Sequence, residues 1–202
     1  MSLKELRWTS VVIGMLLSFG TLIAGNLLYQ QYLVKAPLED ALSQRTEIMD
    51  WSLQKETNKT VLIIELGPVS NLKESCSFIQ EITSRYLGDD GVEILIADHR
   101  TPELEEVKYA LQFSLYEALA QGNFTKMSEM VNTEVEKAKL SKHQVFVDEN
   151  YLYIQLFRDE DYLYEVIPRA SGQQTNIIIK GISELEKDPD TNRLSGQLVP
   201  EQ

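Results

Sequence analysis

One stretch near the N-terminus constrains this chain more than any other feature, because no charged residue occurs between Thr9 and Val34. Its apolar part reads VVIGMLLSFGTLIAGNLLY. A helix of this length, rising about 1.5 Å per residue, crosses a hydrocarbon layer of about 30 Å. We therefore predict a transmembrane helix over residues 9–33, followed by a stalk over residues 34–46.

The residues that flank this segment indicate its orientation. Lys4 and Arg7 precede it, and basic residues stay preferentially on the cytoplasmic side of a membrane. Lys35 on the other side weakens this bias. Aromatic residues, which favour the membrane interface, lie near both ends: Trp8, Tyr29 and Tyr32. We predict a single-pass protein of a bacterial-type cell membrane, with residues 1–8 in the cytoplasm and the C-terminal domain outside.

A cleaved signal peptide is the alternative interpretation of the same residues. Its apolar region would run from Val11 to Ala24. Cleavage after Ala24 would place Leu22 at a position where small residues are favoured, and the apolar run continues through Tyr29. The pattern favours an uncleaved anchor, although it leaves cleavage open.

The charge of the chain restricts its partners. The formal net charge over 202 residues is −12, and Lys4 and Arg7 lie before the apolar segment, so the remainder is strongly acidic. Such a surface repels phosphate backbones and anionic headgroups, which argues against nucleic-acid binding. Cys76 is the single cysteine, so packing without an intramolecular disulfide must hold the fold together.

Residues 47–181 have the pattern of one mixed α/β domain. Alternation over residues 47–53 predicts a strand that forms a hairpin, through a turn at Asn58, with the apolar run 61–66. A helix from Ser70 or Asn71 to about residue 87 separates this run from a second apolar run, 92–97. Strand, helix and strand at this length predict a parallel crossover.

The second half of the domain begins with helical periodicity and ends with strands. Thr101 and Pro102 start the helical region, which Gly122 and Asn123 divide into two helices or one kinked helix. Three β-rich runs predict an antiparallel meander over residues 144–148, 151–157 and 162–167, and residues 176–180 add a possible strand. Residues 182–202 are polar, and we expect a disordered tail. The fold class is α+β behind one membrane helix.

Two groups of side chains are candidate sites. Asp98, His99 and Arg100 follow a buried strand, and α/β sheets bind ligands at the carboxyl ends of such strands. This placement supports an enzyme or small-ligand sensor. Tyrosine is enriched at protein interfaces, and four tyrosines alternate along the meander: Tyr151, Tyr153, Tyr162 and Tyr164. This face supports a binding or scaffold protein, which is the preferred hypothesis, with other proteins as partners and a homo-oligomer as a possible assembly.

No motif in the sequence assigns a catalytic residue, a cofactor or a metal. GxGxxG, phosphate-loop, GxSxG, HExxH and CxxC patterns do not occur. Cys76 fits a buried small hydrophobe, and His143 lies in a turn without a partner motif. The acidic run from Asp188 begins like a calcium loop, but Arg193 replaces the required glycine and Val199 the required glutamate.

Overall fold

The computed structural model describes residues 8–56, 59–169, 176–185 and 187, and it describes no side chain for residues 8–10, 27 and 29–31. The chain divides into two compact units, Met1–Gln44 and Arg45–Gln202. Residues 1–7 of the predicted cytoplasmic flank (residues 1–8), the turn residue Asn58, and residues 186 and 188–202 of the predicted tail (residues 182–202) lie outside the described residues.

The N-terminal unit consists of consecutive helical segments. Helix α1 (Trp8–Tyr29) passes through a π-helical segment, η2 (Gln30–Lys35), into α2 (Ala36–Ser43), which has a proline in its first turn. Every side chain between Val11 and Asn26 is exposed. Among the residues that the structure describes, no helix is found that is long and apolar enough to span a membrane. The membrane anchor therefore stays a prediction.

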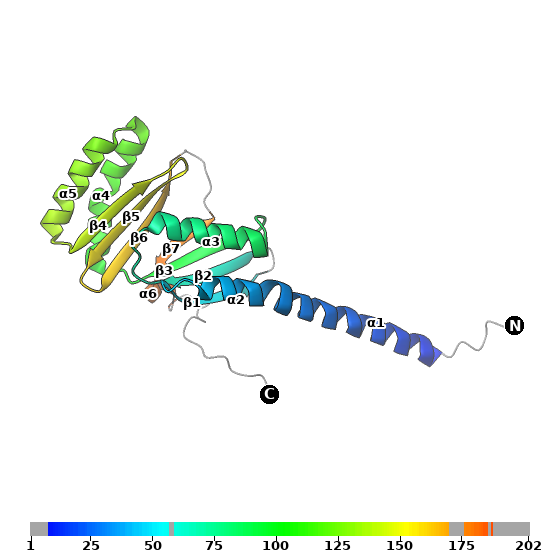
Figure 1. Cartoon of the computed structure of the whole chain (residues 1–202). Helices are drawn as coiled ribbons and strands as arrows, with labels where there is room; N and C mark the ends of the chain where they lie inside the picture. The colour runs from blue at the N-terminus through cyan, green and yellow to red at the C-terminus, as the bar shows by residue number, and fades with distance from the viewer. Residues whose placement is uncertain (1–7, 57–58, 170–175, 186, 188–202) are drawn as a thin grey trace. The chain divides into compact units, whose positions relative to one another are not determined.

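The second unit is mixed α/β, as predicted, and contains a four-stranded sheet with the order β1-β2-β3-β7 (Figure 1). Strand β1 is antiparallel to β2, whereas β2, β3 and β7 are parallel to one another. The predicted crossover is confirmed, and the short run near residue 177 proves to be the fourth strand. The strands are β1 (Ile48–Lys55), β2 (Thr60–Leu66), β3 (Val92–Asp98) and β7 (Ile177–Gly181).

Helix α3 (Leu72–Leu87) connects β2 to β3. Asn71 caps its first turn, because the side chain accepts a hydrogen bond from the backbone N–H of Glu74. Gly88 ends the helix with φ of 85°, which a glycine adopts without strain. The buried side of α3 includes Cys76 and Ile79, both fully inaccessible to solvent.

Two separate helices follow β3. Helix α4 (Pro102–Gln121) ends at Gly122, whose left-handed φ of 67° turns the chain, and the Asn123 side chain caps α5 (Phe124–Ala138). Of the two arrangements that the sequence left open, the structure thus has two helices in tandem.

The predicted meander is confirmed as a second, antiparallel sheet with the order β4-β5-β6. One of its faces packs against α4 and α5, and this core includes Leu111, Leu115 and Val131 from the helices and Leu156 and Leu163 from the strands. The strands are β4 (Lys142–Val147), β5 (Tyr151–Arg158) and β6 (Asp161–Pro168).

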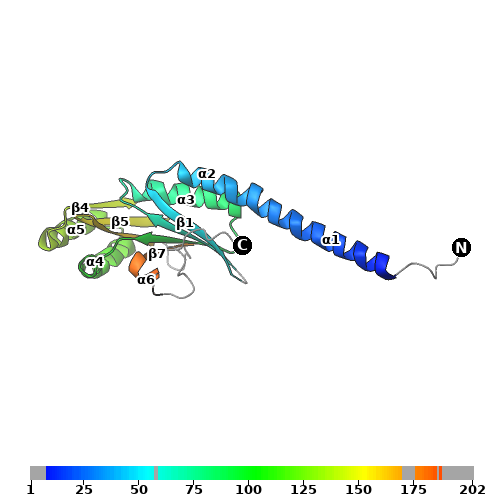
Figure 2. The ribbon, with the colours of Figure 1, turned by 90° about the horizontal axis from the view of Figure 1, so that it is seen from below.

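The two sheets adjoin where β3 ends and β6 begins, since the N–H of Tyr162 donates to the carbonyl oxygen of His99. Helix α3 lies on one side of the strands, and α4, α5 and α6 (Ile182–Leu185) lie on the other side (Figure 2). The carboxyl end of the parallel strands therefore faces the meander of the same chain, and this arrangement decides what is accessible there.

Candidate functional site

The end of β3 carries a buried ion pair between two of the residues that the sequence analysis selected. Arg100 holds Asp98 in a bidentate contact, with Nε 2.7 Å from Oδ1 and Nη2 3.0 Å from Oδ2. The side chains are 6% and 0% exposed. Two parallel N–H donors on one carboxylate fix the geometry of both groups. The pair is thus a rigid element of the interior.

Neighbouring elements supply further partners to this pair. Asp98 Oδ2 accepts the backbone N–H of Tyr164 in β6 at 2.7 Å. Arg100 donates from Nη1 to Oε1 of Glu105 in α4 at 2.7 Å and from Nη2 to the carbonyl oxygen of Tyr164 at 3.3 Å. The ion pair therefore joins the end of β3 to both β6 and α4.

Burial and charge act in opposite directions on the two ionised groups. Burial raises the pKa of the Asp98 carboxyl, and the hydrogen bonds and charge of Arg100 oppose that change. For Arg100, burial works to lower the pKa, but the hydrogen bonds and charges of Asp98 and Glu105 raise it above its usual value. The guanidinium is therefore held as a cation.

Gly181 of β7 packs against the side chain of Arg100. A Cβ atom at this position would lie 2.7 Å from Cγ of Arg100 and 3.0 Å from its Cδ. The stem of the arginine thus lies directly on the backbone of β7. A residue with a side chain would displace Arg100 from Asp98.

His99 does not join this group. Its side chain is 60% exposed, and Nδ1 lies 3.7 Å from Oδ1 of Asp161 at the surface. The three consecutive residues that the sequence suggested as one ligand pocket are therefore divided between the interior and the surface. Asp98 and Arg100 bind each other, while His99 points away from them.

The side chains of Gln155 and Tyr164 bond to the backbone that follows β2, beside an open depression of about 430 Å³ at the end of this strand. Gln155 accepts the N–H of Leu72 through Oε1 at 2.9 Å and donates from Nε2 to the carbonyl oxygen of Val69 at 2.8 Å. The Tyr164 hydroxyl accepts the N–H of Val69 at 2.9 Å and donates to the carbonyl oxygen of Gly67 at 2.8 Å. The meander therefore satisfies the backbone groups where an α/β sheet commonly leaves room for a ligand.

The tyrosines of the meander differ from the exposed face that the sequence analysis expected. Tyr153, Tyr162 and Tyr164 are 1%, 3% and 0% exposed, and only Tyr151 of the four is partly accessible. Tyr162 and Tyr164 pack with ring centroids 5.2 Å apart. Burial raises the pKa of the Tyr162 hydroxyl to about 12. Alternation placed these residues on one face correctly, but the chain covers that face itself.

An aromatic row on α4 is the surface feature that the sequence analysis missed. Tyr109, Phe113 and Tyr116 are 67%, 77% and 55% exposed. They occupy the side of α4 opposite its core stripe at a spacing of four and three residues, which places them on one face. The signal was present in the sequence, because α4 carries large apolar side chains outside the stripe that packs on the meander.

A groove of about 330 Å³ runs beside this row, between α4 and β6. Tyr109, Tyr116 and Gln112 contribute from the helix, and Glu165 and Ile167 contribute from the strand. Lys108 Nζ in its wall lies 3.0 Å from Glu105 and 3.7 Å from Glu165. Aromatic and carboxylate groups thus meet in one open depression.

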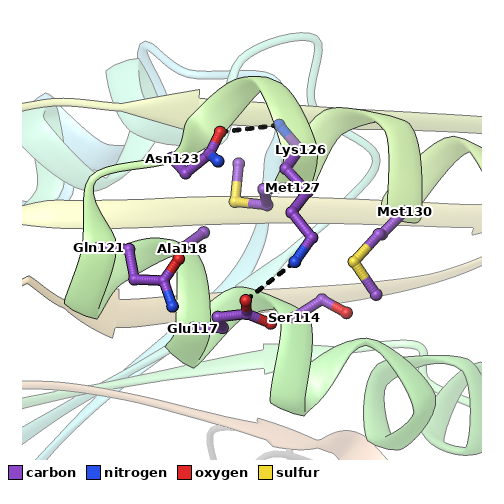
Figure 3. A pocket seen from close by; sticks show the side chains of 8 residues that line it. All are labelled: Ser114, Glu117, Ala118, Gln121, Asn123, Lys126, Met127 and Met130. Atoms are coloured by element: carbon purple, nitrogen blue, oxygen red, sulfur yellow. Dashed lines mark hydrogen bonds and ion pairs between the residues drawn. The ribbon is translucent and has the colours of Figure 1, made fainter.

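A second hollow, between α4 and α5, is too small for a ligand. Figure 3 shows the side chains around it, with Lys126 reaching from α5 to Oε1 of Glu117 in α4 at 2.9 Å. Its volume of about 10 Å³ is about that of one water molecule. The contact between Lys126 and Glu117 joins the two helices, and the Asn123 side chain caps the first turn of α5.

The remaining candidates for chemistry have structural surroundings. Cys76 is buried, and burial raises the pKa of its thiol to about 12, so it is not an activated nucleophile. His143 Nε2 lies 2.9 Å from Oδ1 of Asn132 at the surface. Within the described part of the chain, no group of three or more histidine, cysteine or acidic side chains is arranged to hold a metal ion.

Comparison with known proteins finds no matching family model, no matching curated protein and no matching solved structure.

Proposed function

We propose that this protein is a membrane-anchored, extracytoplasmic binding or scaffold protein of a bacterial envelope, which acts through protein–protein contacts. The observation that carries the proposal is the exposed aromatic row of α4, Tyr109, Phe113 and Tyr116. Large aromatic side chains anchor protein interfaces because they bury much apolar area at a low cost in conformational entropy. This row replaces the meander tyrosines as the proposed contact surface.

The alternative, an enzyme or ligand sensor at Asp98, His99 and Arg100, has less support. Asp98 and Arg100 already bind each other and the backbone of β6. A substrate would have to break this buried pair before either group became available, which is costly. The exposed histidine alone provides neither an oriented base nor a nucleophile.

The anchor in this proposal rests on the uncharged run of residues 9–33 and on the helical conformation of α1. Reporter fusions at Lys35 and at the C-terminus test it, with one reporter active only outside the membrane and one active only inside. Activity of the outside reporter at both positions is the expected result. Activity of the inside reporter at the C-terminus would contradict the topology, and a mature N-terminus near Gly25 would contradict the anchor.

Quantitative co-purification tests the contact function. Tagged full-length protein is isolated from the membranes of cells that naturally produce it, and its bound proteins are compared among three variants. Phe113→Glu places a charge in the aromatic row, and we expect it to lower the amount of specifically bound partner protein at least tenfold. Thr133→Glu, at an exposed position of α5, and His99→Ala should retain them. Equal recovery with Phe113→Glu, or loss with His99→Ala alone, would overturn the proposal.

A further inference from the structure

We propose that the groove between α4 and β6 receives a lysine or arginine side chain of a partner protein, flanked there by apolar residues that cover the aromatic row. This inference rests on the proposed function and specifies the chemistry of the partner.

The charges around the groove leave one carboxylate without a full partner. Asp98, Glu105 and Glu165 form a chain of contacts with two cations, Arg100 and Lys108. Arg100 has short contacts with Asp98 and Glu105, and Lys108 has its short contact, 3.0 Å, with Glu105. Within the described residues, the ion pair of Glu165 is the 3.7 Å contact with Lys108. An additional cation would therefore find an underpaired acceptor here.

The position of Glu165 increases the effect of such a cation. Its side chain is 30% exposed, and it lines the groove beside Tyr109 and Tyr116. Burial raises the pKa of this carboxyl, and Lys108 and Arg100 offset the effect only in part. A charge pair in a partly desolvated site is stronger than one in bulk water. A basic side chain that enters the groove would gain from this environment.

The aromatic walls fit the same occupant. A guanidinium or ammonium group gains from the face of a tyrosine ring, and the aliphatic stem of lysine or arginine packs on apolar surface. Leu115 and Ile167 provide that surface in the groove. Phe113, 77% exposed and farther along α4, would meet an apolar neighbour of the basic residue.

Charge argues against a second copy of this chain as the occupant. The exposed face of α4 carries Glu106 at one end, whereas Glu117 at the other end is paired with Lys126 at 2.9 Å. In a contact between two copies, the charge of Glu106 would therefore be unfavourable. The whole chain carries −12, which adds repulsion. A partner with a basic segment avoids both costs and gains from long-range attraction.

Photo-crosslinking from position 113 tests the inference in the full chain. The photoreactive residue p-benzoylphenylalanine replaces Phe113 in cells that naturally produce the protein, and mass spectrometry identifies the crosslinked segment. We expect a segment of another protein with a lysine or arginine within about four residues of the crosslink. Introduction of Glu165→Gln should reduce the crosslinking yield at least tenfold. Glu160→Gln, which removes the same charge from the exposed β5–β6 turn, should leave the yield unchanged.

The outcomes separate this inference from the proposed function. A crosslinked protein segment without a basic residue, or a yield that Glu165→Gln does not change while the variant retains the wild-type circular dichroism spectrum, overturns the basic-side-chain inference and leaves a contact function in place. A crosslink to a second copy of this chain also overturns it. No crosslinked protein above the yield obtained from position 133 overturns the proposed function together with the inference.

Discussion

The end of β3 and the outer face of α4 are both close to Glu105, which pairs with Arg100 and also lines the groove beside Tyr109. The two regions nevertheless differ in the exposure and in the bonding of their side chains. At the end of β3, Asp98 and Arg100 are buried and bind partners within the chain. On α4, Phe113 is 77% exposed. Asp98 and Arg100, which were candidates for function in the sequence, hold the fold together. The aromatic row of α4, which was not a candidate, has the exposure of a contact site.

The strongest test of this contrast removes the buried carboxylate. Asp98→Ala leaves the Arg100 guanidinium without its bidentate partner and the N–H of Tyr164 without its acceptor. We expect a loss of about 3–5 kcal/mol in the free energy of unfolding. Urea unfolding of the full-length protein, followed by circular dichroism, measures it. His99→Ala, in the exposed neighbour, is the control and should change stability by less than about 0.5 kcal/mol.

Tyr164→Phe tests whether the buried hydroxyl is structural. The substitution leaves the carbonyl oxygen of Gly67 and the N–H of Val69 without their partner. An unsatisfied buried polar group costs about 1–3 kcal/mol, so we expect a loss in this range. Tyr116→Phe removes the same hydroxyl from an exposed ring and should be neutral. If both substitutions lowered the free energy of unfolding equally, the hydroxyl of Tyr164 would not be more important for stability than the exposed hydroxyl of Tyr116.

Gly181→Ala tests the close approach of β7 to the ion pair. The added methyl group would collide with the stem of Arg100, which Asp98 holds in place. Overpacking of this kind costs about 1–3 kcal/mol. The cost should shrink when Arg100 is also replaced by alanine, because the collision disappears. A full cost in the absence of the arginine would assign the glycine another role.

Glu165→Gln should stabilise the protein slightly, with a characteristic pH dependence. Burial raises the pKa of Glu165 in the folded state above the unfolded value of about 4.3. Ionised Glu165 therefore opposes folding at neutral pH, and the wild-type protein regains this stability as the pH falls through the folded pKa. The advantage of the variant should be present at pH 7 and absent below about pH 4. Urea unfolding at several pH values measures it.

The smallest effect belongs to the aromatic row. Phe113→Glu changes a side chain with few contacts inside the chain, so the free energy of unfolding should shift by less than about 0.5 kcal/mol. The same substitution should remove bound partners. A loss of several kcal/mol would show that Phe113 is part of the core and would remove the contrast between the two regions.

The sequence predicted local structure better than exposure. Asn71, Pro102, Gly122 and Asn123 mark helix ends that chain-local rules describe, and each occupies the expected position. The apolar run before Asp98 likewise predicted a buried parallel strand. These features depend on neighbours along the chain, which a sequence pattern contains.

The sequence did not predict which side chains are exposed, because exposure depends on long-range packing. Tyr164 alternates like a surface residue of a half-buried strand, but the loop after β2, far away in sequence, covers it. Asp98 and Arg100 lie where ligands often bind, but the meander fills that place. For the same reason, the sequence did not predict that Phe113 is exposed. A helix with apolar side chains on two sides, such as α4, is either fully buried or has a contact surface.

The hydrogen bonds of Gln155 and Tyr164 also determine how the domain comes apart. Each side chain belongs to the meander and bonds to the backbone at the start of α3 or just before it. We therefore expect the three-stranded sheet to open together with the four-stranded sheet, so that the domain unfolds in one cooperative step. The amide protons of Val69 and Leu72 lie in a loop and at a helix end, but they should exchange with solvent as slowly as the amide protons of the central strands.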